Sequence, residues 1–229
     1  MAEGLRVAVT IRPLHSILSG LLAGGEAPQL LYPTRSALQH PIDEPAWDRL
    51  QKADLLFWVG PELEVNLATR LTEMPSTLQT VAMLDNSNIK VLPAADGMRD
   101  PYFWLDSRNM LILLDDLTRL LIERDPVRTH LYVRNRQRLL QEVAQMDRQM
   151  EYGYRSLQGS SSYLFHATQH YFAQAYALNI AAAVDTAPTS PYSTEMLLAA
   201  RRDLQLLDID CIITEQEYPQ QGLMPMPLS

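Results

Sequence analysis

The chain has 229 residues, a formal net charge of -8 and a single cysteine, Cys211. This length allows one large domain or two small ones with a hydrophobic core, and one cysteine excludes an internal disulfide framework and a cysteine-based zinc finger. The acidic balance, without any run of Lys and Arg, argues against a nucleic-acid partner.

The first part of the chain alternates between short apolar runs and amphipathic stretches. The apolar runs predict strands at 5–11, 29–32, 54–60, 80–84 and 89–92. Helices are predicted at 13–20, 44–52, 62–71 and 108–124, and the polar stretch 34–44 reads as a loop. The run DLLFWVG is typical of a strand that is covered on both faces. We therefore expect an N-terminal α/β lobe with a parallel sheet over residues 1–124.

A long helical stretch follows, from Asp125 to about Ser156. Asp125 suits the N-cap and Pro126 the first helical position. Apolar side chains recur at three- and four-residue steps, at Leu131, Leu139, Leu140, Val143, Met146 and Met150. About 30 helical residues would span roughly 45 Å, so we expect a linking helix over 125–158 between two lobes. A coiled coil is the alternative, but sustained heptads are not evident.

The remaining residues repeat the alternation on a smaller scale. Strands are predicted at 163–166, 179–184 and 210–214, and helices at 169–176 and 190–207. This predicts a shortened C-terminal α/β lobe over 159–229, with an irregular tail after Pro219. One sheet edge would be left open, so we expect that a partner or a second copy of the chain, forming a homodimer, covers it.

The sequence carries no recognisable catalytic motif. There is no Gly-rich phosphate loop after a strand and no G-x-S-x-G elbow. Cys211 lies in the apolar run CII, which favours a buried structural thiol over a reactive one. No apolar run reaches the length of about 18 residues that a membrane span needs, so we expect no direct insertion into a membrane.

Seven segments, in order, resemble one protein family: VAVTIRPLHSIL, KADLLFWVGPELE, DPYFWLDSRNM, DPVRTHLYVRNRQRLLQEV, LFHATQHYFAQAYALN, SPYSTEMLLAARRDL and CIITEQEY. The chain resembles the periplasmic solute-binding proteins of zinc and manganese ABC importers. The resemblance implies two α/β lobes with parallel sheets, joined by a long backbone helix, and a ligand bound in the cleft between them. It also implies an ABC permease as partner and a periplasmic or extracytoplasmic location, with the signal peptide already removed.

The family's metal ligands are mostly replaced. Its first His falls on Leu38 and its second on Tyr102, and a phenol, with a pKa near 10, is a poor zinc ligand at neutral pH. Its third His falls on His166. Its fourth ligand, a carboxylate, lies beyond the last segment and has no counterpart here, and the family's acidic, His-rich loop is also absent. The resemblance thus implies a degenerate site at which metal binding is weak or lost.

Three further residues are candidates to complete a site with His166. His40 lies two residues past Leu38, His170 forms an H-x-x-x-H pair with His166, and Glu215 follows the last strand. Each also has a structural interpretation, as a solvated loop residue or a capping group. Zinc is the expected ion, manganese less so, and the site also allows no metal at all. Carboxylates elsewhere are expected to be structural, with Glu62 and Glu64 favouring a helix N-terminus and Asp100 and Asp106 acting as caps.

Three functions follow. The first is a solute-binding component of a metal importer with an altered site. The second is a non-metal binding or accessory protein-interaction module on the same fold, with Leu38 and Tyr102 filling the cleft. The third, for which the residues offer least, is a hydrolytic enzyme.

Overall fold

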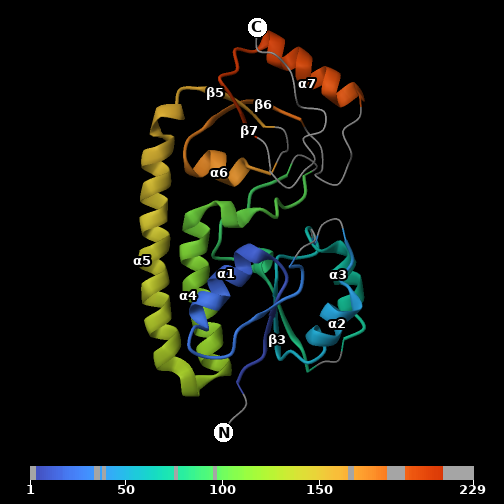
Figure 1. Cartoon of the computed structure of the whole chain (residues 1–229), viewed down its shortest axis with the longest axis vertical. Coiled ribbons are helices and arrows are strands. Elements are labelled where there is room, and N and C mark those ends of the chain that lie inside the picture. The colour runs from blue at the N-terminus through green and yellow to red at the C-terminus, as the bar shows by residue number, and fades with distance from the viewer. Residues whose placement is uncertain are drawn as a thin grey trace. The chain divides into compact units, whose positions relative to one another are not determined.

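The computed structural model describes residues 4–33, 37, 40–74, 77–94, 97–164, 168–184 and 194–213 (Figure 1). The chain divides into two compact units. The first unit comprises Met1–Pro93 and Met98–Arg148, and the second comprises Ala94–Gly97 and Gln149–Ser229. Each is an α/β lobe with a parallel sheet, and a long helix runs from one into the other. The predicted fold class is therefore confirmed, while the domain boundaries drawn from the sequence stay a prediction.

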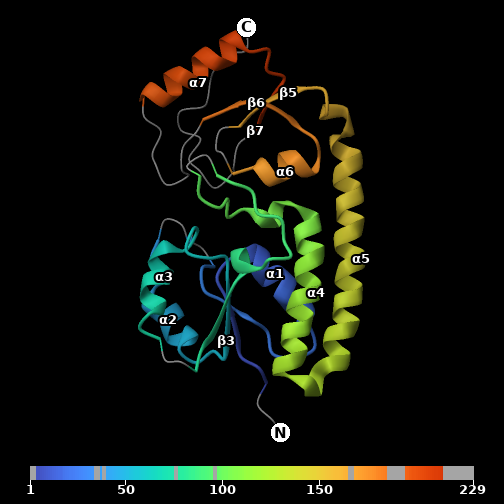
Figure 2. The ribbon, with the colours of Figure 1, turned by 180° about the vertical axis from the view of Figure 1, so that it is seen from behind.

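The first unit contains a four-stranded parallel sheet in the order β2-β1-β3-β4. Its strands are β1 (Val7–Val9), β2 (Gln29–Leu30), β3 (Leu55–Trp58) and β4 (Gln79–Ala82). Its helices are α1 (Arg12–Leu21), α2 (Glu44–Leu50), α3 (Val65–Leu71), α4 (Ser107–Arg124) and most of α5 (Thr129–Tyr154), with the short turns η1 (Met83–Asp85), η2 (Phe103–Leu105) and η3 (Pro126–Arg128). Figure 2 shows α2 and α3 on one side of the sheet and α1 and α4 on the other.

The core explains why β3 reads as an uninterrupted apolar run. All four of its residues are buried, because helices cover both faces of the sheet. On the face covered by α2 and α3, Leu56 and Trp58 pack in one cluster with Trp47 and Leu67. The helices begin where the sequence places caps: Asp43 accepts a hydrogen bond from the Ala46 N–H at 2.9 Å, and Pro13 lies in the first turn of α1.

One predicted strand is wrong. Residues 89–92 form no strand; only an isolated bridge joins Pro93 to Arg99 nearby. The backbone there is satisfied by a side chain instead of a neighbouring strand. Lys90 N–H donates to Asn109 Oδ1 at 2.8 Å, and Asn109 Nδ2 donates back to the Lys90 carbonyl at 3.0 Å. A buried Asn from α4 thus supplies the bonds that a sheet would have supplied.

The predicted long helix is confirmed, although it starts later. Asp125 ends α4, η3 makes the turn, and α5 begins at Thr129. The Asp125 carboxylate accepts hydrogen bonds from Arg128 and from the Tyr132 hydroxyl, each at 2.6 Å, instead of capping a helix. Buried Asn135 donates at 2.8 Å to two carbonyls at the end of α1, which fixes α5 against that helix.

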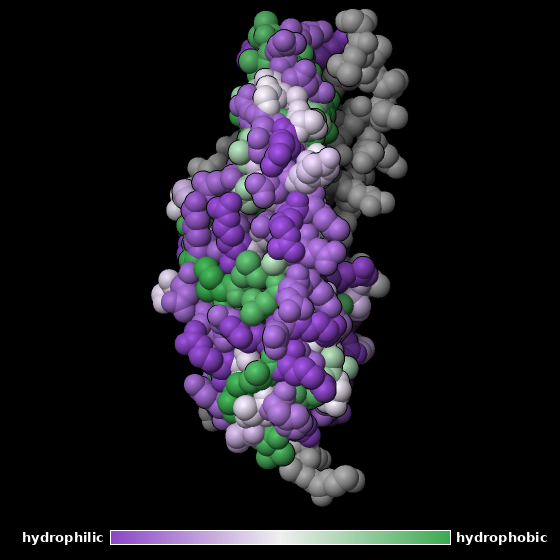
Figure 3. Space-filling view, turned by 90° about the vertical axis from the view of Figure 1, so that its left-hand side faces the viewer, coloured by the Kyte–Doolittle hydropathy of each residue, from purple (hydrophilic) through white to green (hydrophobic). Residues whose placement is uncertain are grey.

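The apolar stripe predicted for α5 is only partly correct. Leu131, Leu139 and Val143 are buried, but Met146 is exposed. The outward face of α5 is largely hydrophilic (Figure 3). His130 is exposed there, as expected for a solvated residue. None of the helices in the described residues has the length and apolar character needed to cross a membrane.

The second unit confirms the predicted β-α-β-α-β order. Its strands β5 (Ser161–Leu164), β6 (Asn179–Ala183) and β7 (Cys211–Ile213) form a parallel sheet in the order β6-β5-β7. The turn η4 (Arg155–Leu157) precedes it, and the helices are α6 (His170–Ala175) and α7 (Thr194–Leu206). Cys211 is only half-buried, so the expectation of a buried thiol is wrong. Ser190, Pro191 and the tail after residue 213 lie outside the described residues.

Candidate functional site

The structure describes three of the six predicted site positions. Leu38, His166 and Glu215 lie outside the described residues. His40 is exposed and precedes α2, and Tyr102 is half-buried; both belong to the first unit. His170 begins α6 in the second unit, is half-buried and is engaged in an interaction within the chain. That these positions share one site stays a prediction.

The described residues contain no metal centre of their own. No three side chains among their His, Cys, Asp and Glu are grouped so that they could hold an ion. His15, which we did not expect to be a ligand, hydrogen-bonds through Nε2 to the Pro28 carbonyl at 3.1 Å.

Tyr102 is held in a defined backbone position. Its N–H donates to Asp100 Oδ1 at 2.9 Å, and the Asp100 N–H donates to the Leu92 carbonyl at 2.8 Å. Its ring meets that of Trp104 edge-on, with 5.3 Å between centroids. Asp106 then caps α4 by accepting from the Arg108 N–H at 2.9 Å. The predicted capping role is confirmed for Asp106, whereas Asp100 accepts from Tyr102 without capping a helix, and both side chains are buried.

Arg99 ties this segment to the rest of the first unit, which the sequence did not indicate. Its guanidinium binds the Glu62 carboxylate, and Nη1 donates to the Leu84 carbonyl and to Asp85 Oδ1, each at 2.9 Å. Glu62, and then Asp85, raise the pKa of Arg99 by favouring its charged form. A lone Arg between Met and Asp carries no motif, so only the three-dimensional structure shows this role.

The structure contradicts the role predicted for Glu64. Neither Glu62 nor Glu64 lies inside a helix, because α3 starts at Val65, and Glu64 makes no side-chain bond to the helix N-terminus. Its side chain turns back instead and accepts from the Val59 N–H at 3.2 Å and the Gly60 N–H at 2.9 Å. Glu64 is 0 % exposed, and burial raises its pKa to about 7, although Thr10 and the two N–H groups favour the charged form.

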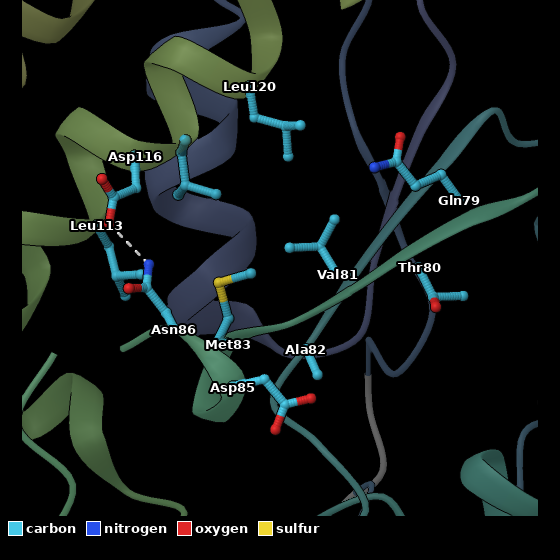
Figure 4. A pocket seen from close by; sticks show the side chains of 11 residues that line it. Gln79, Thr80, Val81, Ala82, Met83, Asp85, Asn86, Leu113, Asp116 and Leu120 are labelled. Atoms are coloured by element: carbon cyan, nitrogen blue, oxygen red, sulfur yellow. Dashed lines mark hydrogen bonds between the residues drawn. The ribbon is translucent and has the colours of Figure 1, made fainter. Parts of the chain in front are cut away.

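A separate groove of about 420 Å³ lies between β4 and α4 (Figure 4). Val81, Met83 and Leu120 line it, and Asp116 stands at one end, where Asn86 Nδ2 donates to it at 2.8 Å. Burial alone would raise the pKa of Asp116, but hydrogen bonds from Asn88 and Asn86, together with Arg119, outweigh burial and lower it. The lining of this groove mixes apolar and polar side chains, and it contains neither His nor Cys, the donors that zinc sites use most.

The comparisons with known proteins agree with this fold. The sequence model of the ZnuA family, described as zinc-uptake complex component A, periplasmic, matches residues 7–224. The chain belongs to the ZnuA family. It is 20% identical over 256 residues to the high-affinity zinc uptake system protein ZnuA of Brucella abortus (strain 2308), covering 93% of this chain and 77% of that protein. This bears out the resemblance drawn from the seven segments.

Solved structures share the fold of this ZnuA-family chain at low identity. A crystal structure of ZnuA matches with a TM-score of 0.84 and 17% identity, covering 96% of this chain and 85% of that one. Zinc-bound AdcA of Streptococcus pneumoniae matches with a TM-score of 0.80 and 18% identity, over 96% of this chain and 48% of that one. The family's description is that of a periplasmic transport component.

Proposed function

We propose that this chain is the solute-binding component of an ABC importer of the zinc and manganese class, with an altered and weakened metal site. The family match over residues 7–224 carries the proposal, together with Leu38 and Tyr102, which the resemblance places at two family ligand positions. Leu38 offers no donor atom, and Tyr102 offers a phenol that stays protonated at neutral pH. The side chain of Tyr102 packs against Trp104, as an aromatic lining would.

The remaining donors favour zinc over manganese. His166, His40 and His170 supply imidazole nitrogens, and Glu215 a carboxylate, which is the donor set that zinc accepts and that suits manganese less well. Because imidazoles bind metal only when neutral, affinity should fall steeply as the pH drops below about 6. The partner in this proposal is a membrane permease with its ATPase, and the location is periplasmic, in line with the family's description.

A second function rests on the same substitutions. An apolar Leu38 and an aromatic pair at Tyr102 and Trp104 suit a site that binds a less polar solute or a protein segment, as a non-metal binding or accessory module. Under this alternative, the fold is kept and metal no longer stabilises it. A hydrolytic activity has no observation in its favour.

A thermal unfolding series with zinc and manganese tests the proposal. A ligand at 100 times its dissociation constant stabilises a protein by about 2.7 kcal/mol. We expect little stabilisation of the wild-type chain at micromolar zinc and a clear gain at higher concentration that His166→Ala removes. The paired substitution Leu38→His with Tyr102→His should restore tight binding, with Leu38→Asn and Tyr102→Phe as matched controls.

Two results would contradict the proposal. Tight zinc binding by the wild-type chain, unaffected by His166→Ala, would show that the site is not the one inferred. Failure of the two restored His residues to raise zinc affinity would show that Leu38 and Tyr102 do not occupy ligand positions. Elemental analysis of the purified chain, with mass spectrometry of any copurified solute, separates the metal-binding role from the non-metal alternative.

A further inference from the structure

Glu64 is a buried carboxylate without a cationic partner. It is fully enclosed in the first unit, at the end of the sheet where β3 leads into α3. None of the salt bridges in the described part of the chain includes it. Its hydrogen-bond donors are the backbone N–H groups of Val59 and Gly60. A carboxylate in such a place is destabilised in its charged form, because two N–H bonds do not replace the lost hydration.

The groups that face Glu64 do not supply the missing positive charge. Thr10, which follows β1, lies against the carboxylate and favours its charged form, although not in well-formed hydrogen-bond geometry. Glu62, on the same loop, adds a like charge. Burial, and then the negative charge of Glu64, raise the pKa of Tyr32, which follows β2. Its buried hydroxyl has no hydrogen-bond partner in the described residues. The charges of Asp43 and Arg70 also act on Tyr32, and the Arg70 guanidinium forms an ion pair with the Glu44 carboxylate at 2.8 Å.

The loop that Glu64 holds is connected to the segment that carries Tyr102. The Val59 carbonyl accepts from the Leu84 N–H at 3.0 Å, and Glu62 binds Arg99. Arg99 also reaches the Leu84 carbonyl and precedes Tyr102 by three residues. A change at Glu64 therefore has a path of hydrogen bonds and ion pairs to Arg99, and from there the backbone leads to Tyr102.

We propose that Glu64 is a proton-responsive positioning residue: its ionised form holds the Val59–Glu64 loop because each carboxylate oxygen accepts a backbone N–H, and its protonation leaves one oxygen a poor acceptor and loosens the loop. Loosening passes through Glu62 and Arg99 to the Tyr102 segment. The ionised carboxylate is costly in this buried site, because it stands beside Glu62 without a counter-ion. The pKa of about 7 for Glu64 places this change at neutral pH. The effect on solute binding rests on the proposed function, but the titration itself does not.

The experiment follows the titration directly in the full chain without added metal. Carbon-13 labelling of the Glu carboxyl groups reports Glu64, and the amide signals of Val59, Gly60, Arg99 and Tyr102 report the path, between about pH 5 and about pH 9. In the wild type we expect all five signals to change together with a midpoint near pH 7. Glu64→Gln, which keeps the size of the side chain, should abolish the transition at every amide.

Glu62→Gln is the matched control. It leaves Glu64 able to titrate, at a lower pH because a like charge is removed. It removes the ion pair to Arg99 but keeps the link through Leu84, so the Tyr102 amide should respond less than in the wild type. Thr10→Val, in which the charged form loses support, should raise the midpoint. If Glu64→Gln does not fold, the wild-type titration and these two variants still test the proposal.

A Glu64 carboxyl that titrates near its ordinary value of about 4.3, or a transition that persists in Glu64→Gln, would overturn the proposal. A Tyr102 amide signal that does not change as Glu64 titrates in the wild type would also overturn the proposal. Because no metal is present, failure here leaves the metal-binding proposal standing, and failure of the zinc series leaves this one standing.

Discussion

The sheets of the two units follow the same parallel plan but are buried to different degrees. All four residues of β3 in the first unit are buried, whereas no residue of β6 or β7 in the second unit is. In the first unit, the loops at the carboxyl end of the sheet are also fixed by side chains such as Glu64 and Arg99. The comparison teaches that the first unit anchors its loops by buried contacts to its sheet, while the second leaves much of its sheet near solvent.

The largest expected effect comes from a substitution in the core of the more buried sheet, in the first unit. Phe57 in β3 is 0 % exposed, so Phe57→Ala should lower the free energy of unfolding by about 3–5 kcal/mol, through lost burial and the cavity left behind. Ile212 in β7 is 41 % exposed, so Ile212→Ala should lower it by only about 1 kcal/mol. Urea unfolding of both variants measures the difference. Equal losses would mean that the two sheets contribute alike.

The next effect concerns pH. The pKa of Glu64 is raised in the folded chain, to about 7, so the folded state binds this proton more tightly than the unfolded state does. The stabilisation is complete below the unfolded value, near 4.5, and is lost as the pH rises through 7. From pH 4 to pH 8, the wild type should therefore lose about 3 kcal/mol more stability than Glu64→Gln.

Urea unfolding at closely spaced pH values, in the wild type and in Glu64→Gln, measures that difference. Glu62→Gln serves as a second reference, because it should keep most of the pH dependence. Parallel curves for the wild type and Glu64→Gln would show that the buried carboxyl has no special affinity for its proton.

Much of the fold could be predicted from the sequence because apolar periodicity and capping residues act locally. The run around β3 and the caps at Asp43 and Asp106 are examples. The strand expected at 89–92 failed because Asn109, distant in sequence, takes over the backbone bonds of Lys90. Apolar periodicity also predicted that Met146 would be buried, whereas it is exposed.

The candidate site was predictable only where a residue replaces another in a recognisable segment, as at Tyr102. The burial of Glu64 was not predictable, because a carboxylate just before a helix normally faces the helix N-terminus and solvent. Its burial depends on the conformation of Val59 and Gly60, whose N–H groups turn toward it at the end of β3. Such backbone geometry leaves no periodic mark in the sequence, and neither does the ion pair between Arg99 and Glu62.

The smallest expected effect lies on the outer face of α7 in the second unit. Leu206 is 74 % exposed, so Leu206→Ser should change the free energy of unfolding by no more than about 0.5 kcal/mol. Ala200 is buried on the inner face of the same helix against Tyr163 and Val184, so Ala200→Leu should cost about 1–3 kcal/mol by overpacking. Thermal unfolding compares the two. A large loss in Leu206→Ser would mean that this face of α7 is covered in solution, and the second unit would then be less open than its sheet indicates.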